Sequence, residues 1–117
     1  MPVILATMIG FLSAYALGPT QGTIAIRQEW GQLPQDLSQY DVFLAVESCD
    51  HIGREVVMEI EGESYQGLIF DCAGADAYSD GQSWMSRNQI AAEVDYWFWM
   101  ENPHLIGSET TATIVFK

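Results

Sequence analysis

Several short segments of the chain alternate apolar and polar positions, which is typical of β-strands. Residues 54–71, "REVVMEIEGESYQGLIFD", alternate in this way and then turn at residues 61–64, before an apolar run that begins at Leu68. The pattern predicts a β-hairpin whose tip carries three glutamates. Residues 22–30, residues 40–48 and the final "TTATIVFK" contain β-branched and aromatic residues between turn-forming connectors. We expect a strand in each of these segments.

A segment late in the chain has a helical pattern instead. In residues 86–102, "SRNQIAAEVDYWFWMEN", Ser86 and Gln89 have the spacing of a helix capping box. Three apolar residues then follow at i, i+4 and i+7, from Ile90 to Trp97, which would place them on one buried face. Short strands, one late helix and a final strand predict a mainly β protein, a small barrel with one short helix packed against it.

The first residues form an apolar segment followed by a small-x-small pattern at residues 14–16, and the first charged side chain is Arg27. This is typical of a secretory signal peptide, although no basic residue precedes the apolar run and a membrane span needs roughly 20 residues. A cleaved signal, an uncleaved anchor and an ordinary buried segment stay open. We expect export, with residues 1–16 as the signal or hydrophobic segment and residues 17–117 as the barrel domain. Membrane contact would occur only through an uncleaved segment.

The charge of the chain limits its partners. The 117 residues include 16 acidic and four basic side chains, for a net charge of -12, and 49% of them are hydrophobic. This length suits a single domain with its own core. Such an acidic surface repels nucleic-acid phosphates and anionic lipids, which excludes nucleic-acid binding. It suits a neutral or cationic partner or serves solubility alone, and we expect a monomer.

Two cysteines, Cys49 and Cys72, occur in the chain. In an oxidising compartment an even number predicts a disulfide, worth ~3 kcal/mol, and two buried free thiols are the alternative. Two thiols without a CxxC pair do not complete a zinc site, and Asp76 and Asp80 lack the spacing of a calcium loop. We therefore expect no metal, no cofactor and an extracytoplasmic location.

Four motifs follow one another along residues 22–117: "IGREV", "EGESYQGLIFDCAG", "SWMSRNQIAAEV" and "TATIVFK". Together they resemble the double-psi β-barrels of the rare lipoprotein A, expansin and barwin type. In that family a Leu/Ile-Gly turn precedes one strand, a later strand ends in an aspartate, and a second aspartate opens a short Ala-rich helix. The resemblance implies a six-stranded double-psi barrel that binds peptidoglycan or another polysaccharide.

The resemblance also aligns the family's two aspartates with this chain. The first falls on Asp71, after an apolar run, and the second falls on Ser86. Inverting cleavage of a glycosidic bond requires one acid and one carboxylate base, and a serine hydroxyl is no acid near neutral pH. The resemblance therefore implies polysaccharide binding without strong hydrolysis. Two alternatives are a peptidoglycan lytic transglycosylase with Asp71 as the general acid, and a non-catalytic protein-interaction barrel with an acidic surface.

Further side chains complete the candidate site. A disulfide would bring His51 near Asp71, which makes His51 a weaker catalytic candidate, and the alternative is a partly exposed turn residue. Indole rings form platforms for sugars, because the apolar face of a sugar ring packs on them, although such rings more often belong to the core. The candidates for substrate binding are Trp84, Ser86 and Trp99.

Overall fold

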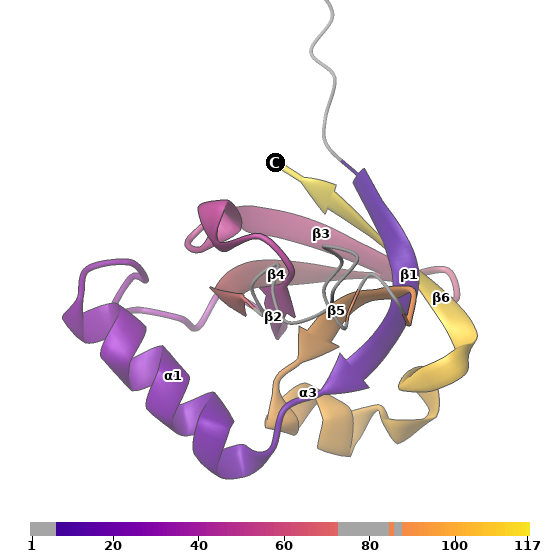
Figure 1. Cartoon of the computed structure of the whole chain (residues 1–117), viewed down its shortest axis with the longest axis horizontal. Helices are drawn as coiled ribbons and strands as arrows, with labels where there is room; N and C mark the ends of the chain where they lie inside the picture. Colours follow the sequence, from indigo (N-terminus) through magenta and orange to yellow (C-terminus); the bar gives the residue numbers. More distant parts are fainter. Residues whose placement is uncertain (1–6, 73–84, 86–87) are drawn as a thin grey trace, which may run out of the picture.

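Six strands close into a β-barrel in the computed structural model, which describes residues 7–72, 85 and 88–117 (Figure 1). The strands are β1 (Thr7–Ala14), β2 (Val42–Val46), β3 (Glu55–Ile60), β4 (Glu63–Cys72), β5 (Ile90–Val94) and β6 (Gly107–Phe116). Their order around the barrel is β1-β5-β2-β4-β3-β6. The pairs β1–β5 and β2–β4 are parallel and the remaining pairs are antiparallel. The predicted mainly β class is confirmed, and this mixed barrel is compatible with a double-psi barrel.

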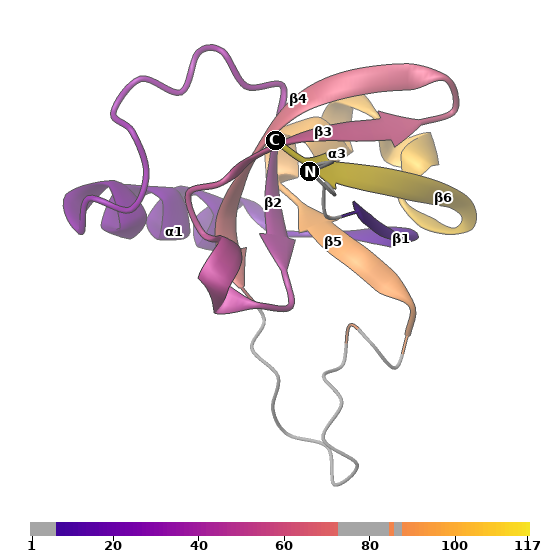
Figure 2. The same ribbon diagram turned by 90° about the horizontal axis from the view of Figure 1, so that it is seen from above.

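Helices lie outside the barrel. The long helix α1 (Leu17–Glu29) runs alongside it, and the short α3 (Tyr96–Glu101) follows β5 (Figures 1 and 2). Two 3-10 turns, η1 (Cys49–His51) and η2 (Pro103–Leu105), precede β3 and β6. Among the described residues, no helix has both the length and the apolar character to cross a membrane.

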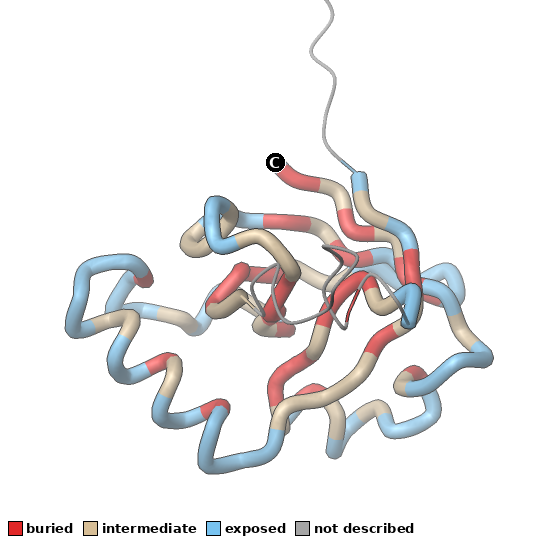
Figure 3. The backbone as a smooth tube through the Cα atoms, in the orientation of Figure 1, coloured by how far each residue is buried: buried red, intermediate tan, exposed pale blue. Residues whose placement is uncertain are grey.

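The barrel has a core inside and a smaller apolar cluster outside, beneath α1. Buried positions follow the strands through the barrel (Figure 3). Because β2 and residues 67–70 of β4 are buried on both faces, between the interior and α1, both segments are nearly continuous apolar runs. The interior core includes Leu12, Leu44, Val56, Met58, Val94 and Ile114, and the outer cluster consists of Ile24, Leu33, Ala45, Leu68 and Phe70.

The predicted hairpin is confirmed. β3 and β4 pair in antiparallel register from Glu55 opposite Leu68 to Ile60 opposite Glu63. The turn is the two-residue Glu61-Gly62, and both residues have positive φ, 50° and 81°. Such left-handed pairs match the twist of a hairpin, and glycine adopts them without steric cost. The strands expected at residues 40–48 and at the C-terminus are present as β2 and β6.

Two local predictions are wrong. Residues 22–30, expected as a strand, belong mostly to α1, whose buried residues Thr20 and Ile24 are spaced i and i+4. Residues 86–102, expected as a helix, contain β5 instead, and only the short α3 is helical. Gln89 has φ 58°, which no helix interior allows, so the expected capping box cannot exist. The long helix therefore lies early in the chain.

The predicted disulfide is confirmed. Cys49 and Cys72 are bonded, with their Cα atoms 4.9 Å apart, and the bond closes a loop over a separation of 23 residues. It joins η1 to the end of β4. A disulfide is consistent with an oxidising, extracytoplasmic environment.

The N-terminal apolar segment contributes a strand to the barrel. Residues 7–14 form β1, which lies between β5 and β6, and Leu12 is in the interior core. The barrel thus begins upstream of the domain boundary expected at residue 17. Cleavage after residue 16 would remove β1 and break the closure of the sheet.

Candidate functional site

At the end of β4, Asp71 contacts Tyr15 and Arg27, and Trp30 lies beside Arg27. We call these four side chains the Asp71 cluster. Arg27 Nη2 donates to Asp71 Oδ1 at 2.8 Å, and the Tyr15 hydroxyl donates to Asp71 Oδ2. The side chains of both ion-pair partners are 17% exposed. Asp71 is therefore a half-buried carboxylate with a donor on each oxygen.

Local irregularity in β4 explains why Asp71 faces outward. The parallel register with β2 pairs Leu44 with Ile69 and then Ala45 with Asp71, so Phe70 is an extra residue at a β-bulge. Such bulges redirect the following side chain. Ile69 consequently belongs to the interior core, whereas Phe70 belongs to the outer cluster and Asp71 meets α1.

The last turn of α1 supplies the cation and leads to the exposed aromatic ring. Arg27 lies seven residues after Thr20, on the face of α1 that packs on the barrel. Its Nη1 also donates to Gln32 Oε1 at 2.8 Å, and its guanidinium lies 5.6 Å from the centre of the Trp30 ring. Trp30 is 61% exposed. The cluster therefore presents a solvent-facing indole beside a guanidinium that is fixed on two sides.

The chemistry of the cluster suits hydrogen bonding better than proton donation. Burial, and then the hydrogen bond to Asp71, raise the pKa of Tyr15, so its hydroxyl stays protonated and remains a donor. Each carboxylate oxygen of Asp71 already accepts one bond but has two acceptor positions. Asp71 can thus accept a further hydrogen bond from a ligand. A general acid would have to be protonated, and the two donors beside Asp71 favour its ionised form.

A second carboxylate, that of Glu93, lies on the outer face of the barrel in a row of opposed residues that begins at Asp71. Asp71 is opposite Ala45, Ala45 is opposite Glu93, and Glu93 is opposite Ser13, so the four share the outer face. Burial raises the pKa of Glu93, and the charge of Asp71 raises it further, while the Ser13 hydroxyl lowers it. The helical period expected for residues 90–94 gave no sign of Glu93, which a strand places on the same face as Asp71.

Another aspartate was missed at the start of α3. Asp95 is 2% exposed, its Oδ1 accepts from the Phe43 backbone amide at 2.8 Å, and its Oδ2 accepts from that of Phe98 at 3.1 Å. Burial raises the pKa of Asp95, and the amide hydrogen bonds oppose this. Asp95 is a helix cap that also ties α3 to β2. The sequence feature that could have identified this cap is an aspartate directly after the segment 90–94 and three residues before Phe98.

Outside the Asp71 cluster, the predicted site residues lie in several places. His51 packs against Phe116, with ring centres 4.5 Å apart, and its Nδ1 lies 3.3 Å from Arg54 Nη1. It shares no hydrogen bond with Asp71 in the described structure. Trp99 is half-buried against the core, while Trp97, expected to be buried, is 42% exposed. Trp84 and Ser86 lie outside the described residues.

No protein-family model, curated protein or solved structure matches this chain. The double-psi type and the rare lipoprotein A family therefore stay predictions from the sequence motifs. The closed mixed barrel is compatible with the double-psi type.

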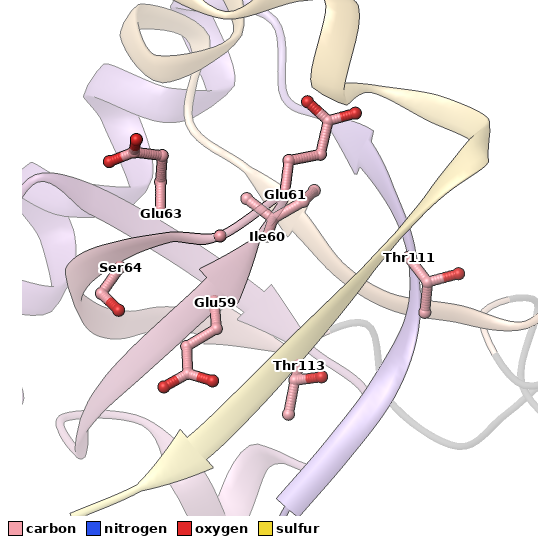
Figure 4. A pocket seen from close by; sticks show the side chains of 8 residues that line it. Glu59, Ile60, Glu61, Glu63, Ser64, Thr111 and Thr113 are labelled. Atoms are coloured by element: carbon pink, nitrogen blue, oxygen red, sulfur yellow. The ribbon is translucent and has the colours of Figure 1, made fainter.

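The hairpin tip forms an acidic cavity of about 400 Å³, lined by residues 59–64 with Thr111 and Thr113 of β6. The carboxylates of Glu59, Glu61 and Glu63 point in different directions (Figure 4). Within the described ranges, no three His, Cys, Asp or Glu side chains are grouped to hold a metal ion. The arrangement suits a solvated, negatively charged tip.

Proposed function

We propose that this chain is an extracytoplasmic barrel of the rare lipoprotein A and expansin type that binds a polysaccharide without cleaving it. The observation that carries the proposal is the exposed Trp30 indole beside the fixed pair of Arg27 and Asp71. A sugar ring offers an apolar face to an indole and hydroxyl groups to charged partners. The cluster supplies both kinds of contact at one place.

Preorganisation supports binding at this cluster. Arg27 is held by Asp71 and Gln32, and Asp71 is held by Tyr15, so these side chains have little freedom left to lose. Immobilising a mobile, rotamer-rich side chain costs about 0.5–1.5 kcal/mol in a complex. A neutral glycan also avoids the repulsion that the net charge of -12 would exert on an anionic ligand.

The positions of the aspartates favour binding over cleavage. The resemblance aligns the second aspartate of the family, which opens a short Ala-rich helix, with Ser86, and the aspartate that opens α3 in this chain is Asp95. Two backbone amides occupy the Asp95 oxygens, and the residue is almost fully buried. Asp71 carries a donor on each oxygen. Neither side chain is arranged to give a proton to a glycosidic oxygen.

The extracytoplasmic location rests on the disulfide between Cys49 and Cys72. Such bonds persist in oxidising compartments and are rare in the cytosol. Glycans of the cell wall occupy the same side of the membrane, which joins the location to the proposed ligand.

The proposal is tested by sedimentation of the purified protein with insoluble peptidoglycan and with cellulose. We expect Trp30→Ala to weaken binding about tenfold, since stacking on one aromatic ring contributes on the order of 1 kcal/mol or more. Trp97→Ala is the matched control, because that indole is 42% exposed on α3. Equal binding by Trp30→Ala and the wild type would contradict the proposal.

Two other outcomes would replace it. Release of soluble sugar fragments that Asp71→Asn abolishes would support a lytic transglycosylase. Failure to bind either glycan would refute polysaccharide binding and leave a protein-interaction barrel with an acidic surface.

A further inference from the structure

Gln32 lies beside the Asp71 cluster, and the end of α1 places it there. The helix ends in a Schellman motif, in which the Gly31 amide donates to the Gln28 carbonyl at 3.1 Å. In the same motif the Gln32 amide donates to the Arg27 carbonyl at 2.9 Å. Gly31 has φ 75°, the left-handed conformation that this position of the motif requires. The chain therefore turns back on the last turn of α1, and residue 32 returns to Arg27.

The backbone of Gln32 is held on both sides, although its side chain is on the surface. The next residue, Leu33, is 4% exposed and belongs to the outer apolar cluster beneath α1. A Cβ at Gly53 would lie 2.7 Å from the Gln32 carbonyl oxygen, so the turn between η1 and β3 packs directly on this backbone. Gln32 consequently has little backbone freedom to lose when a ligand binds.

The side-chain amide of Gln32 has a defined orientation. Its Oε1 accepts from Arg27 Nη1 at 2.8 Å. A guanidinium has donors and no acceptor, so the amide oxygen must face Arg27 and Nε2 must face away from it. Nε2 makes no hydrogen bond with another residue in the part of the chain that the structure describes, and the residue is exposed. Gln32 thus presents two oriented N–H donors to solvent.

This amide and the Trp30 ring lie against the same guanidinium. Arg27 Cζ is 5.6 Å from the centre of the Trp30 ring, and Arg27 Nη1 holds the Gln32 oxygen. Gly31 alone separates Trp30 from Gln32 in the chain. A sugar ring that stacks on the exposed indole can therefore extend a substituent to the Gln32 amide.

The charges and donors at this place favour one kind of substituent. Arg27 and Asp71 neutralise each other, and the chain has a net charge of -12, so a sugar carboxylate would be repelled. A hydroxyl group can accept from Nε2, but its own hydrogen then needs an acceptor. The carbonyl oxygen of an acetamido group is neutral and only accepts. The oriented donor therefore favours an acetamido group over a hydroxyl group or a carboxylate.

We propose that Gln32 is a specificity-determining residue whose Nε2 donates to the acetamido carbonyl of an N-acetylated hexosamine stacked on Trp30. The inference rests on the proposed polysaccharide binding and adds the chemical class of the ligand, a glycan with N-acetylated sugars. It also divides the work at the site. Trp30 supplies affinity for any neutral pyranose ring, and Gln32 distinguishes one sugar from another.

The test compares chito-oligosaccharides and cello-oligosaccharides of equal length by calorimetry. The two ligands share their linkage and differ in an acetamido or a hydroxyl group on the second carbon of each sugar. We expect the wild type to bind the N-acetylated ligand about fivefold more tightly, the effect of one net hydrogen bond. Gln32→Glu keeps an oxygen for Arg27 but replaces the Nε2 donor with an acceptor. It should lose the preference and keep the affinity for cello-oligosaccharides.

Matched variants separate the donor from its charge and from general binding. Gln21→Glu adds the same charge at an exposed position of α1 and should keep the preference. Gln32→Met removes the donor without adding a charge and should lose the preference. Trp30→Ala should weaken both ligands alike.

The failure of this inference is distinct from failure of the proposed function. Equal affinity of the wild type for the two ligands, or a preference that persists in both Gln32 variants, would refute the role of Gln32 and leave polysaccharide binding standing. If the wild type binds neither these ligands nor insoluble glycan, both are refuted. Melting temperatures of the variants identify any loss of binding that comes from unfolding.

Discussion

The packing of β1 against β5 depends on Gly10, and replacement of this glycine tests the barrel directly. A Cβ at Gly10 would lie 2.6 Å from the Gln89 carbonyl oxygen and 2.8 Å from the Ala91 amide nitrogen. Both are backbone atoms, so no side-chain rotation relieves the contact. The neighbouring Phe11 amide donates to the same Gln89 carbonyl at 2.9 Å. Gly10→Ala would therefore force the two parallel strands apart.

The cost follows from two contributions. Overpacking of a well-packed site costs about 1–3 kcal/mol, and a rigid backbone obstacle places this substitution near the upper value. Weakening of the Phe11 hydrogen bond adds about 1 kcal/mol. We expect Gly10→Ala to lower the free energy of unfolding by about 3–4 kcal/mol, a large part of the 5–15 kcal/mol typical of a domain. At about 4 °C per kcal/mol, Tm should fall by about 12–16 °C.

Urea and thermal unfolding measure this change, and a second glycine provides the control. Gly22 lies within α1, and a Cβ there would have no heavy atom within 4 Å. Gly22→Ala should therefore raise stability by about 0.5–1 kcal/mol through helix propensity. An unchanged Tm for Gly10→Ala would refute the packing of β1 on β5. Since a domain cleaved after residue 16 lacks Gly10, the mass of the protein must be checked in the same samples.

Three further predictions concern the Asp95 cap, the disulfide and the buried carboxylate of Glu93. Asp95→Ala should lower the free energy of unfolding, measured in urea, by about 2–4 kcal/mol, because two backbone amides lose their acceptor. Asp95→Asn should lose less stability, because its side chain keeps one acceptor oxygen. Equal losses for the two variants would contradict the capping role. Reduction of the bond between Cys49 and Cys72 should cost about 3 kcal/mol, and the double serine variant should then be insensitive to reductant. Burial raises the pKa of Glu93 in the folded state, so the native protein binds its proton more tightly, and stability should fall as pH rises from about 4 through the raised value. Glu93→Gln should make this decline shallower, and an unchanged slope would show that Glu93 does not contribute.

Much of the barrel could be predicted where one period described a segment without ambiguity. Residues 55–60 largely alternate, and the glycine-containing turn at Glu61-Gly62 brings the following segment back beside them as β4. The pairing of Cys49 with Cys72 followed from their number alone, once an oxidising compartment was assumed.

The two local errors have a physical explanation. Ile90 and Val94 are four residues apart, a spacing that fits both a helix face and alternate positions of a strand. Closure of the barrel decides between them, because β5 fills the place between β1 and β2. Residues 22–30 contain β-branched residues that suit a strand, but the barrel already has six strands, and packing of Ile24 on the outer cluster favours the helix.

The Asp71 cluster could be predicted only in part, because its members are distant in sequence. Asp71 itself follows an apolar run, and this local signal identified it. Its partners Arg27 and Tyr15 lie 44 and 56 residues away and come from α1 and the end of β1. Their meeting depends on which side of the barrel α1 covers, and no local pattern encodes that choice.

The same dependence links the N-terminal segment to the proposed function. An apolar strand and the hydrophobic part of a signal peptide have similar composition, so the sequence left both interpretations open. In the barrel, β1 lies between two strands, and Tyr15 directly after it donates to Asp71. Cleavage after residue 16 would therefore remove a wall of the barrel and one of the donors that hold the Asp71 carboxylate. The proposed glycan binding at this cluster therefore requires that residues 7–15 stay attached to the folded protein.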